Sequence, residues 1–228
     1  MKWNNKFTYP KSTRSVINGS RHYALDGSNL PSVTTILKAT QSEEDKAGLA
    51  AWKERVGHKE AERIKNEASN RGSSMHSYIE QFLLGKFNLD LLDEENRSKK
   101  MAIEIIDNGL KNKLSEVWGA EATVYYPGKY AGTADCIGIY EGKETILDFK
   151  QSNKPKKEEY ITDYFLQLSA YSLAHNTVYN SRIVQGVVLL CTVDNLFQDF
   201  KIEGDQLTHY QNRFLEKVEQ FYRQLETN

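Results

Sequence analysis

The sequence predicts an α/β fold in which helices flank a mixed β-sheet, and three observations predict it. Residues 42–114 carry apolar side chains at helical spacing. Three short strand-like runs follow Val117, separated by turns that contain glycine. A further helical pattern, two more strand-like runs and a final amphipathic helix complete the chain. This order of elements is typical of an α/β sandwich around a mixed sheet.

The first forty residues predict a small β-arm and a short helix. Residues 15–17 and 21–25 are strand-like runs that flank Asn18-Gly19-Ser20, and an Asn-Gly pair in this position favours a tight hairpin turn. Residues 30–37 follow as a short helix, with Ser32 in position to cap its first turn.

Three helices are expected between the arm and the sheet. Ser42 is followed by three acidic residues, which favour a helix start because they stabilise its positive N-terminal end. The expected helices cover residues 42–64, 73–84 and 95–114, and Gly85 ends the second of them.

The rest of the chain predicts the sheet and the helices that cover it. Strand-like runs are expected to form strands at residues 122–126, 131–140, 145–150, 183–193 and 197–202. Helical patterns are expected to form helices at residues 158–175 and 206–225.

The composition excludes several classes of protein. The 228 residues, 39% hydrophobic and 27% charged, suit one globular domain. Cys136 and Cys191 are too few for a disulfide framework, a tetrahedral zinc site or an iron–sulfur cluster, and are expected to be buried free thiols. With no signal-peptide pattern and no apolar run near the roughly 18 residues of a membrane span, we expect an intracellular protein that is not secreted and binds no membrane.

Acidic and basic side chains on two neighbouring strand-like runs predict a metal site. Side chains alternate along a strand, so Asp148 and Lys150 should share one face while Leu147 and Phe149 enter the apolar side. If residues 131–140 and 145–150 pair as a hairpin, Asp135 lies near Asp148. Two convergent carboxylates form a hard-oxygen site of the kind that Mg²⁺ or Mn²⁺ prefers.

Other polar residues fit phosphodiester hydrolysis at such a site. Beside a metal and a phosphate, the Lys150 ammonium can orient the attacking water and stabilise developing charge. Gln167 and Tyr171 lie four residues apart on one face of the expected helix and offer hydrogen bonds. His76 could contribute an imidazole ligand, and Gly72 permits close approach of another segment.

Four short motifs follow one another along the chain: Gly-x-x-x-His at Gly72 to His76, Gly-Thr-x-Asp at Gly132 to Asp135, Asp-x-Lys at Asp148 to Lys150 and Gln-x-x-x-Tyr at Gln167 to Tyr171. This ordered set resembles the PD-(D/E)XK nuclease superfamily, and within it the RecB-like exonuclease branch. The likeness to the mitochondrial genome maintenance exonucleases and their phage relatives extends to residues 30–34 and to Trp52-Lys53.

The resemblance implies a restriction-endonuclease-like core in a single nuclease domain. Residues 1–115 would form its β-arm and helical part, and residues 116–228 its catalytic core. It also implies roles for individual residues and one or two Mg²⁺ or Mn²⁺ ions. Some members of the branch carry a four-cysteine iron–sulfur cluster, which the two cysteines of this chain exclude. His76, Asp135, Asp148 and the backbone carbonyl of Phe149 would hold metal, Lys150 would be the catalytic lysine, Gln167 and Tyr171 would support the site, and Glu121 would be an outer acidic residue.

Basic and aromatic residues near these motifs are candidates for contact with DNA. The run that follows the Asp-x-Lys strand would lie beside the scissile phosphate, and an aromatic ring could stack on unpaired bases. The candidates are Arg71, Trp52, Ser152, Lys154, Lys156 and Lys157.

The sequence therefore predicts a metal-dependent DNA exonuclease that prefers single-stranded ends. An endonuclease for flapped or branched DNA and a non-catalytic nucleic-acid-binding module with the same fold remain alternatives. Because the chain lacks the Gly-x-x-x-x-Gly-Lys-Ser/Thr motif of helicases, a helicase, polymerase or single-strand-binding protein would be a partner. A bacterial or phage-infected cytoplasm is the expected location, since no Arg-rich transit segment is present.

Overall fold

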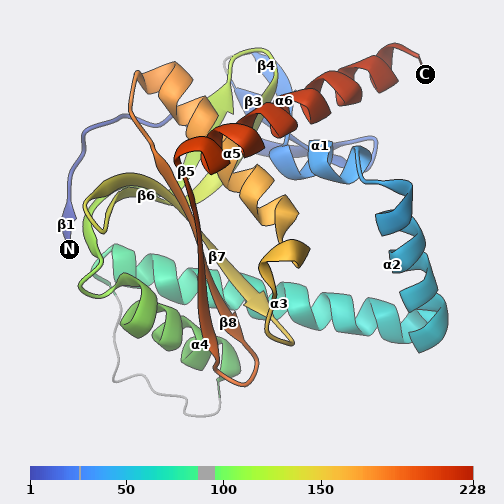
Figure 1. The fold of residues 1–228 in the computed structure, drawn as a ribbon, viewed down its shortest axis with the longest axis horizontal. Coiled ribbons are helices and arrows are strands. Elements are labelled where there is room, and N and C mark those ends of the chain that lie inside the picture. Colours follow the sequence, from blue (N-terminus) through green and yellow to red (C-terminus); the bar gives the residue numbers. More distant parts are fainter. Residues whose placement is uncertain (26, 87–95, 228) are drawn as a thin grey trace.

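A six-stranded mixed sheet lies between two layers of helices, and a separate three-stranded sheet stands at one end (Figure 1). The computed structural model describes residues 1–25, 27–86 and 96–227. The predicted fold class, a mixed sheet flanked by helices, is confirmed.

The elements have the following bounds. The strands are β1 (Lys2–Trp3), β2 (Thr13–Ile17), β3 (Ser20–Leu25), β4 (Ser28–Pro31), β5 (Leu114–Tyr126), β6 (Tyr130–Tyr140), β7 (Lys143–Ser152), β8 (Gln185–Thr192) and β9 (Phe197–Glu203). The helices are α1 (Val33–Ala39), α2 (Glu43–Val56), α3 (His58–Leu83), α4 (Arg97–Ile105), α5 (Thr162–Tyr179) and α6 (Gly204–Glu226), with a π-helical turn η1 (Ile106–Leu110) and a 3₁₀ turn η2 (Glu158–Tyr160).

The main sheet combines an antiparallel meander with a parallel crossover. Its strand order is β1-β5-β6-β7-β8-β9, in which β5, β6 and β7 are antiparallel neighbours. Helix α5 connects β7 to β8, and these two strands are parallel. Because parallel strands need a crossover, the helix must pack over the sheet between them. It thereby covers the face of the sheet from which the Asp148 and Lys150 side chains of β7 project.

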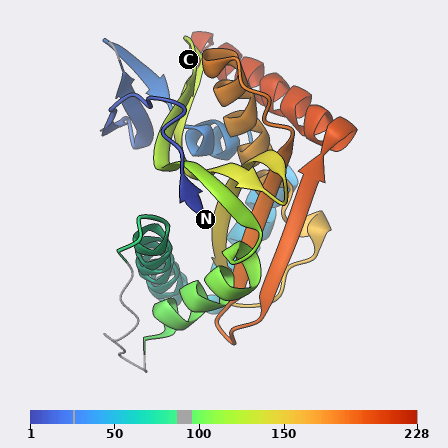
Figure 2. The same ribbon diagram turned by 90° about the vertical axis from the view of Figure 1, so that its left-hand side faces the viewer.

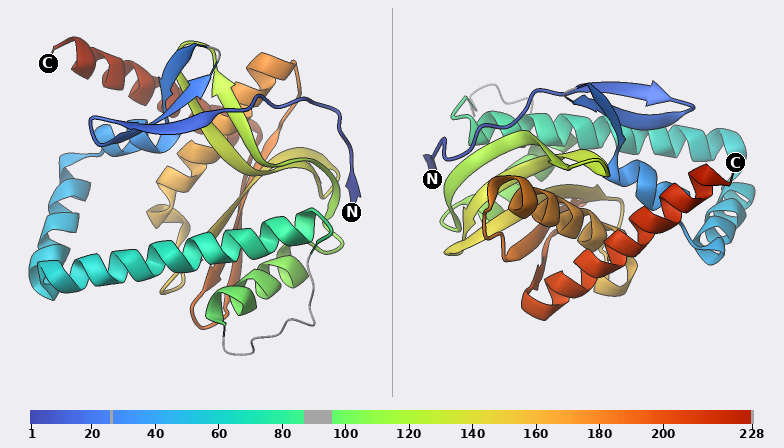
Figure 3. Two further views of the ribbon diagram at one scale, coloured as in Figure 1. Left: turned by 180° about the vertical axis from the view of Figure 1, so that it is seen from behind. Right: turned by 90° about the horizontal axis from the view of Figure 1, so that it is seen from above.

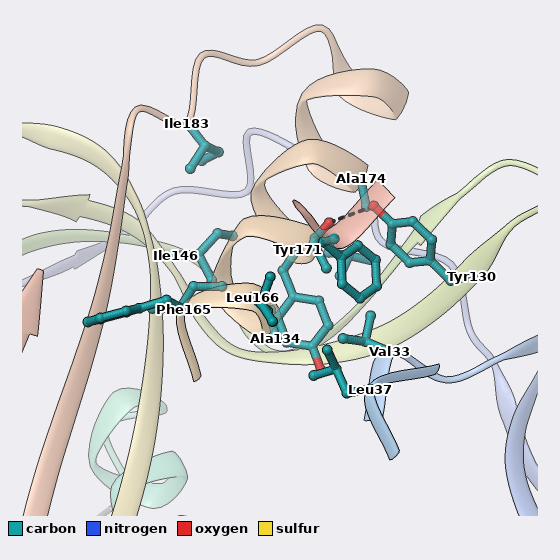
Figure 4. Close-up of a cluster of buried hydrophobic side chains, with 14 of the residues drawn as sticks. Val33, Leu37, Tyr130, Ala134, Ile146, Phe165, Leu166, Tyr171, Ala174 and Ile183 are labelled. Atoms are coloured by element: carbon teal, nitrogen blue, oxygen red, sulfur yellow. Dashed lines mark hydrogen bonds between the residues drawn. The ribbon is translucent and has the colours of Figure 1, made fainter. Parts of the chain in front are cut away.

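Helices lie on both faces of the sheet (Figures 2 and 3), and a hydrophobic core is buried on each face. Helices α1, α5 and α6 cover one face, where Tyr130 donates a hydrogen bond to the carbonyl of Ala170 at 3.0 Å (Figure 4). Helices α3 and α4 cover the other face and bury Met75, Ile79 and Met101 against Leu147. The sheet is therefore buried on both sides over the strands that carry the site.

Local sequence signals at the first two helices and the first hairpin are confirmed. Ser32 caps α1 by accepting from the Thr35 amide at 2.9 Å, and Ser42 caps α2 in the same way. Asn18 and Gly19 have φ angles of 50° and 74°, as a tight hairpin turn of the primed type requires. Both cysteines are buried free thiols, as predicted.

The expected helix at residues 42–64 was wrong in its extent. The chain breaks at Gly57, where φ is 86° and ψ is 141°, a conformation that favours glycine. A second helix, α3, then runs without interruption to Leu83, so the helix expected at residues 73–84 is its second half. The polar composition of residues 58–72 hides this continuity, because these residues carry little apolar periodicity.

The expected helix at residues 95–114 was also too long. Its first residue, Glu95, lies outside the described residues, and the regular helix ends at Ile105 before the η1 turn. Strand β5 already begins at Leu114, eight positions before the expected start. Register shifts against β6 near Val117 disturb the alternation of buried and exposed residues that would have identified the strand.

Candidate active site

Asp148 and Lys150 project from the same face of β7, as their spacing predicts. Asp148 is only 1% exposed, and its carboxylate forms an ion pair with the Lys150 ammonium. The alternate residues Leu147 and Phe149 enter the core under α3 and α4. Burial of a carboxylate is costly, so the ammonium compensates a charge that would otherwise lie alone in the protein.

Asp135 lies beside this pair, on the neighbouring strand β6. Cys136 is opposite Leu147 in the antiparallel register, and the Asp135 carboxylate accepts a hydrogen bond from the Phe149 amide at 2.7 Å. The pairing of these two strands, from which the proximity of Asp135 and Asp148 was predicted, is thus present.

His76 reaches the two strands from the second half of α3. Its Nε2 is 2.8 Å from the carbonyl oxygen of Phe149, and its Nδ1 is 3.6 Å from Asp135 Oδ1 and 3.7 Å from Glu121 Oε1. A ring nitrogen that donates to a backbone carbonyl fixes the tautomer and leaves the other nitrogen free to bind a cation. The Phe149 carbonyl retains a second lone pair for the metal contact that the resemblance implies.

Glu121, for which the resemblance implied an outer acidic role, lies among the possible metal ligands. One ligand atom each from His76, Glu121 and Asp135 lies within 4.8 Å of the others, whereas Asp148 is held by Lys150. Glu121 has a φ of 48° and interrupts the regular pairs Ala120–Cys136 and Ala122–Ala134. A left-handed conformation outside glycine is strained, and such strain at a strand irregularity can redirect a side chain toward a site.

The charges of the cluster perturb one another strongly. Burial raises the pKa of Asp135, and the negative charge of Asp148 raises it further. Burial alone would lower the pKa of His76, but Asp135 and Glu121 outweigh it and raise that pKa to about 9. Burial opposes the charge of Lys150 as well, yet Asp148 and Asp135 raise its pKa on balance. The carboxylates therefore stabilise the positive charges of His76 and Lys150.

This environment fits a divalent cation. Asp148 Oδ2 is paired with the Lys150 ammonium, whereas the equally buried Oδ1 has no hydrogen-bond partner among the described groups. Three carboxylates and one imidazole converge on the same small cavity, and carboxylate oxygens with an imidazole suit Mg²⁺ or, better, Mn²⁺. A bound cation would compensate the acidic charge that Lys150 balances only in part.

Gln167 and Tyr171 face the site from α5. The Gln167 amide donates to the Tyr171 hydroxyl at 3.1 Å, and Tyr171 is buried against β6 (Figure 4). A Cβ on Gly132 would lie 2.4 Å from Cε1 of Tyr171, so the glycine makes room for this ring. The two motifs that contain Gly132 and Tyr171 thus fit together sterically.

The β-arm contributes residues that the sequence did not indicate. Arg14, Arg21, Tyr23 and Thr34 line a cavity of about 160 Å³ together with the acidic cluster, Lys150, Gln167 and Tyr171. No sequence motif marks Arg14, Arg21 or Tyr23, because only the docking of the arm on β6 brings them to the site. Thr34 lies on α1 and is one of residues 30–34, to which the family resemblance extends.

The six residues expected to contact DNA lie outside this cavity. Arg71 donates to the side chains of Gln151 and Asn153, which attaches α3 to the end of β7. Ser152 is buried, and the backbone of Lys156 is bonded to Gln198. Lys154 and Lys157 are exposed on the segment after β7, and Trp52 is half-buried on α2. Their contact with DNA stays a prediction.

Comparisons with known proteins reveal relatives that match most of the chain. No protein-family model matches it. Mitochondrial genome maintenance exonuclease 1 of Xenopus tropicalis is 26% identical over 221 residues, or 91% of this chain and 61% of the relative. The human protein of that name is 29% identical over 84% of this chain and 58% of its own length. The mouse protein is 30% identical over 75% of this chain and 52% of its own length.

This chain therefore spans between half and two thirds of the length of the relatives that it matches. None of the described helices is both long enough and apolar enough to cross a membrane. The resemblance to the mitochondrial genome maintenance exonucleases is confirmed: the chain is a homologue of these proteins.

Proposed function

We propose that this protein is a divalent-metal-dependent nuclease that hydrolyses DNA phosphodiester bonds as an exonuclease, with preference for single-stranded ends. One observation carries the proposal: His76, Glu121 and Asp135 converge in the cavity that also contains the Asp148–Lys150 ion pair. An acidic cluster beside a buried ammonium suits a negatively charged substrate bound through a cation. The names of the relatives support the exonuclease activity.

The chain's own residues would divide the work as follows. His76, Glu121, Asp135 and Asp148 would hold the cation, with the Phe149 carbonyl beside them. When bound, Mg²⁺ or Mn²⁺ supplies Lewis acidity and lowers the pKa of water. The Lys150 ammonium keeps its proton at neutral pH because its pKa is raised, so it donates hydrogen bonds rather than abstracting a proton. It would orient the attacking water and stabilise charge on the phosphate.

Gln167 and Tyr171 would act on the other side of the cavity. Their mutual hydrogen bond holds the amide and the hydroxyl in fixed positions. An amide and a phenol can contact a phosphate oxygen without adding charge, which leaves the charge balance of the site to Lys150 and the carboxylates. We assign them the support of the substrate phosphate.

The arrangement of α2 and α3 supports the preference for ends. Helix α2 has no buried side chain, and it joins α1 to the end of α3 that lies farthest from α4 (Figure 1). Because α2 connects α1 to α3, which carries His76, it would restrict the approach of a continuous duplex to the site. A strand end could reach the cavity with less hindrance. A helicase, polymerase or single-strand-binding protein would then supply such ends.

Digestion of defined substrates tests this proposal. Linear single strands, circular single strands, blunt duplexes and flapped circles are incubated with Mg²⁺, with Mn²⁺ or with a chelator. We expect metal-dependent degradation of the linear single strand and resistance of the circular one. Cleavage of flapped circles at the branch would support the structure-specific endonuclease instead. DNA binding without cleavage under any metal condition would support the non-catalytic module.

A further inference from the structure

We propose that the β-arm, formed by β2, β3 and β4, carries a phosphate-binding subsite built from Arg14 and Arg21. This subsite would hold the DNA backbone at the phosphate next to the scissile one. The inference deepens the proposed function, on which it rests, by naming the groups that position the substrate opposite the acidic cluster.

The register of the arm places both arginines on one face. Arg14 on β2 is the cross-strand partner of Tyr23 on β3, and directly opposite residues of an antiparallel pair project to the same side. Arg21 precedes Tyr23 by two residues on β3, so its side chain also projects to that side. Arg14, Arg21 and Tyr23 therefore form a single surface, and the ring of Tyr23 lies 5.8 Å below the Arg14 guanidinium.

This surface is fixed against the strand that carries Asp135. The Tyr23 hydroxyl lies 3.1 Å from Thr133 Oγ1, and Arg14 Nη2 donates to the same oxygen at 2.9 Å. The Arg21 carbonyl accepts from the Ser32 amide at 3.0 Å and from the Thr35 hydroxyl at 2.9 Å. The Arg14 side chain and the Arg21 backbone are thus held in place before any substrate binds, which lowers the entropy cost of binding.

The position of Thr133 gives the distance between the subsite and the metal cluster. Thr133 and Asp135 are two residues apart on β6 and line the same cavity, and an extended strand rises about 6.6 Å over two residues. Neighbouring phosphates of an extended single strand are separated by a comparable step. A phosphate at Arg14 and a phosphate at the acidic cluster would therefore belong to adjacent nucleotides.

The charges of the cavity also favour one phosphate at the arginines and another at the acidic cluster. Lys150 is paired with Asp148, whereas neither Arg14 nor Arg21 forms an ion pair with any described carboxylate. The two guanidiniums are the basic groups of the cavity that remain available to an anion. A guanidinium binds phosphate oxygens through two parallel hydrogen bonds, so a pair of them suits a backbone phosphodiester.

Binding of a fluorescent single strand, with Ca²⁺ in place of Mg²⁺, tests the subsite. The variants are Arg14→Gln, Arg21→Gln and their combination, and the matched control is Arg223→Gln at the exposed end of α6. We expect each arm variant to raise Kd about tenfold and to flatten the salt dependence by about 0.7 in the log–log slope for each arginine removed. KM should rise similarly with a smaller change in kcat, and the control should match the wild type.

Methylphosphonate substitution locates the contact on the DNA. An uncharged linkage next to the scissile one should weaken binding by the wild type but add little to the defect of the double variant. Unchanged Kd and salt slope in the arm variants would overturn the subsite, as would equal sensitivity of wild type and double variant at every linkage. If the wild type binds DNA through these arginines but cleaves no substrate, the subsite stands and the proposed nuclease function fails.

Discussion

Tyr171 packs directly over Gly132, so that a methyl group at position 132 would lie 2.4 Å from the ring carbon Cε1 and 2.9 Å from the hydroxyl. The glycine belongs to the strand that carries Asp135, and the tyrosine belongs to the helix that crosses over it. Gly132 and Tyr171 lie 39 positions apart in sequence, and their two motifs are thus one steric unit. The contact fixes the depth at which α5 packs on the sheet behind the acidic cluster.

Substitution Gly132→Ala should therefore destabilise the protein and displace Tyr171. Overpacking of a tight core typically costs about 1–3 kcal/mol, and the buried ring has little room to move. Urea denaturation measures the cost. The control is Gly48→Ala on α2, where a Cβ would meet no atom within 4 Å and the free energy of unfolding should rise by at most about 1 kcal/mol.

The cost at Gly132 should depend on the size of residue 171. In a Tyr171→Leu background the clashing ring is absent, so Gly132→Ala should cost much less than it does in the wild type. An equal cost in both backgrounds would show that the ring is not the obstacle.

The buried Asp148–Lys150 pair predicts coupled effects on stability. Asp148→Asn leaves an uncompensated ammonium, and Lys150→Met leaves an uncompensated carboxylate that is 1% exposed. Loss of one partner of a buried pair costs about 3–5 kcal/mol, whereas replacement of both partners can be nearly neutral. We expect the double variant to be more stable than the Lys150→Met variant when unfolding is measured with a chelator present.

Cleavage should respond differently from stability. All three of these variants should lose at least about a hundredfold in kcat, because each lacks a group of the site. A double variant that regains stability but not cleavage would separate the two roles of the pair. A Lys150→Met variant that retains wild-type cleavage would contradict the assignment of the lysine.

Much of the sheet and the acidic part of the site could be predicted because they depend on local alternation. Asp148 and Lys150 share a face by spacing alone, and Asp135 follows once its strand is paired with the next. The position of Glu121 could not be predicted in this way, since it depends on a left-handed residue within a strand. The break at Gly57 was missed for a similar reason, because one backbone angle divides an otherwise continuous helical pattern.

The arm residues of the site are a different case. Arg14 and Arg21 belong to a small sheet that is separate from the main one. Their place in the cavity results from contacts at long range in sequence, such as the one between Tyr23 and Thr133. Periodicity and motif spacing carry no information on such contacts. The basic run after β7 had a stronger sequence signal, yet it lies outside the cavity.

The His76, Glu121 and Asp135 cluster predicts the pH dependence of metal binding. The pKa of His76 without metal is about 9, above the usual 6.5, so the ring carries a proton at pH 7 and must release it to bind a cation through Nδ1. Mn²⁺ affinity should therefore rise with pH, by up to about tenfold for each unit between 7 and 9. Titration calorimetry in buffers of different ionisation enthalpy measures the released proton.

Removal of single ligands should weaken metal binding. His76→Ala and Glu121→Gln should each lower Mn²⁺ affinity at least about tenfold, whereas Glu219→Gln on the exposed face of α6 should not change it. If the Glu121→Gln variant binds Mn²⁺ with wild-type affinity, Glu121 is not a metal ligand and has the outer acidic role that the resemblance implied.

His175 predicts a loss of stability in acid that does not involve the site. The ring is fully buried, with Nε2 3.0 Å from the Tyr9 hydroxyl and Nδ1 2.6 Å from Ser181 Oγ. Burial, aided by the charge of Lys6, lowers its pKa from 6.5 to about 4. Because the unfolded chain binds a proton more readily, stability from the neutral ring is complete above pH 6.5 and is lost as the pH falls toward 4.

At 1.36 kcal/mol per pH unit, this shift corresponds to about 3 kcal/mol. The difference in unfolding free energy between the wild type and a His175→Gln variant should shrink by about that amount between pH 6.5 and pH 4. Carboxylates that titrate in the same range are common to both proteins, so the difference isolates the imidazole. A difference that stays constant over this range would mean that the buried ring accepts a proton in the folded protein as easily as in the unfolded chain.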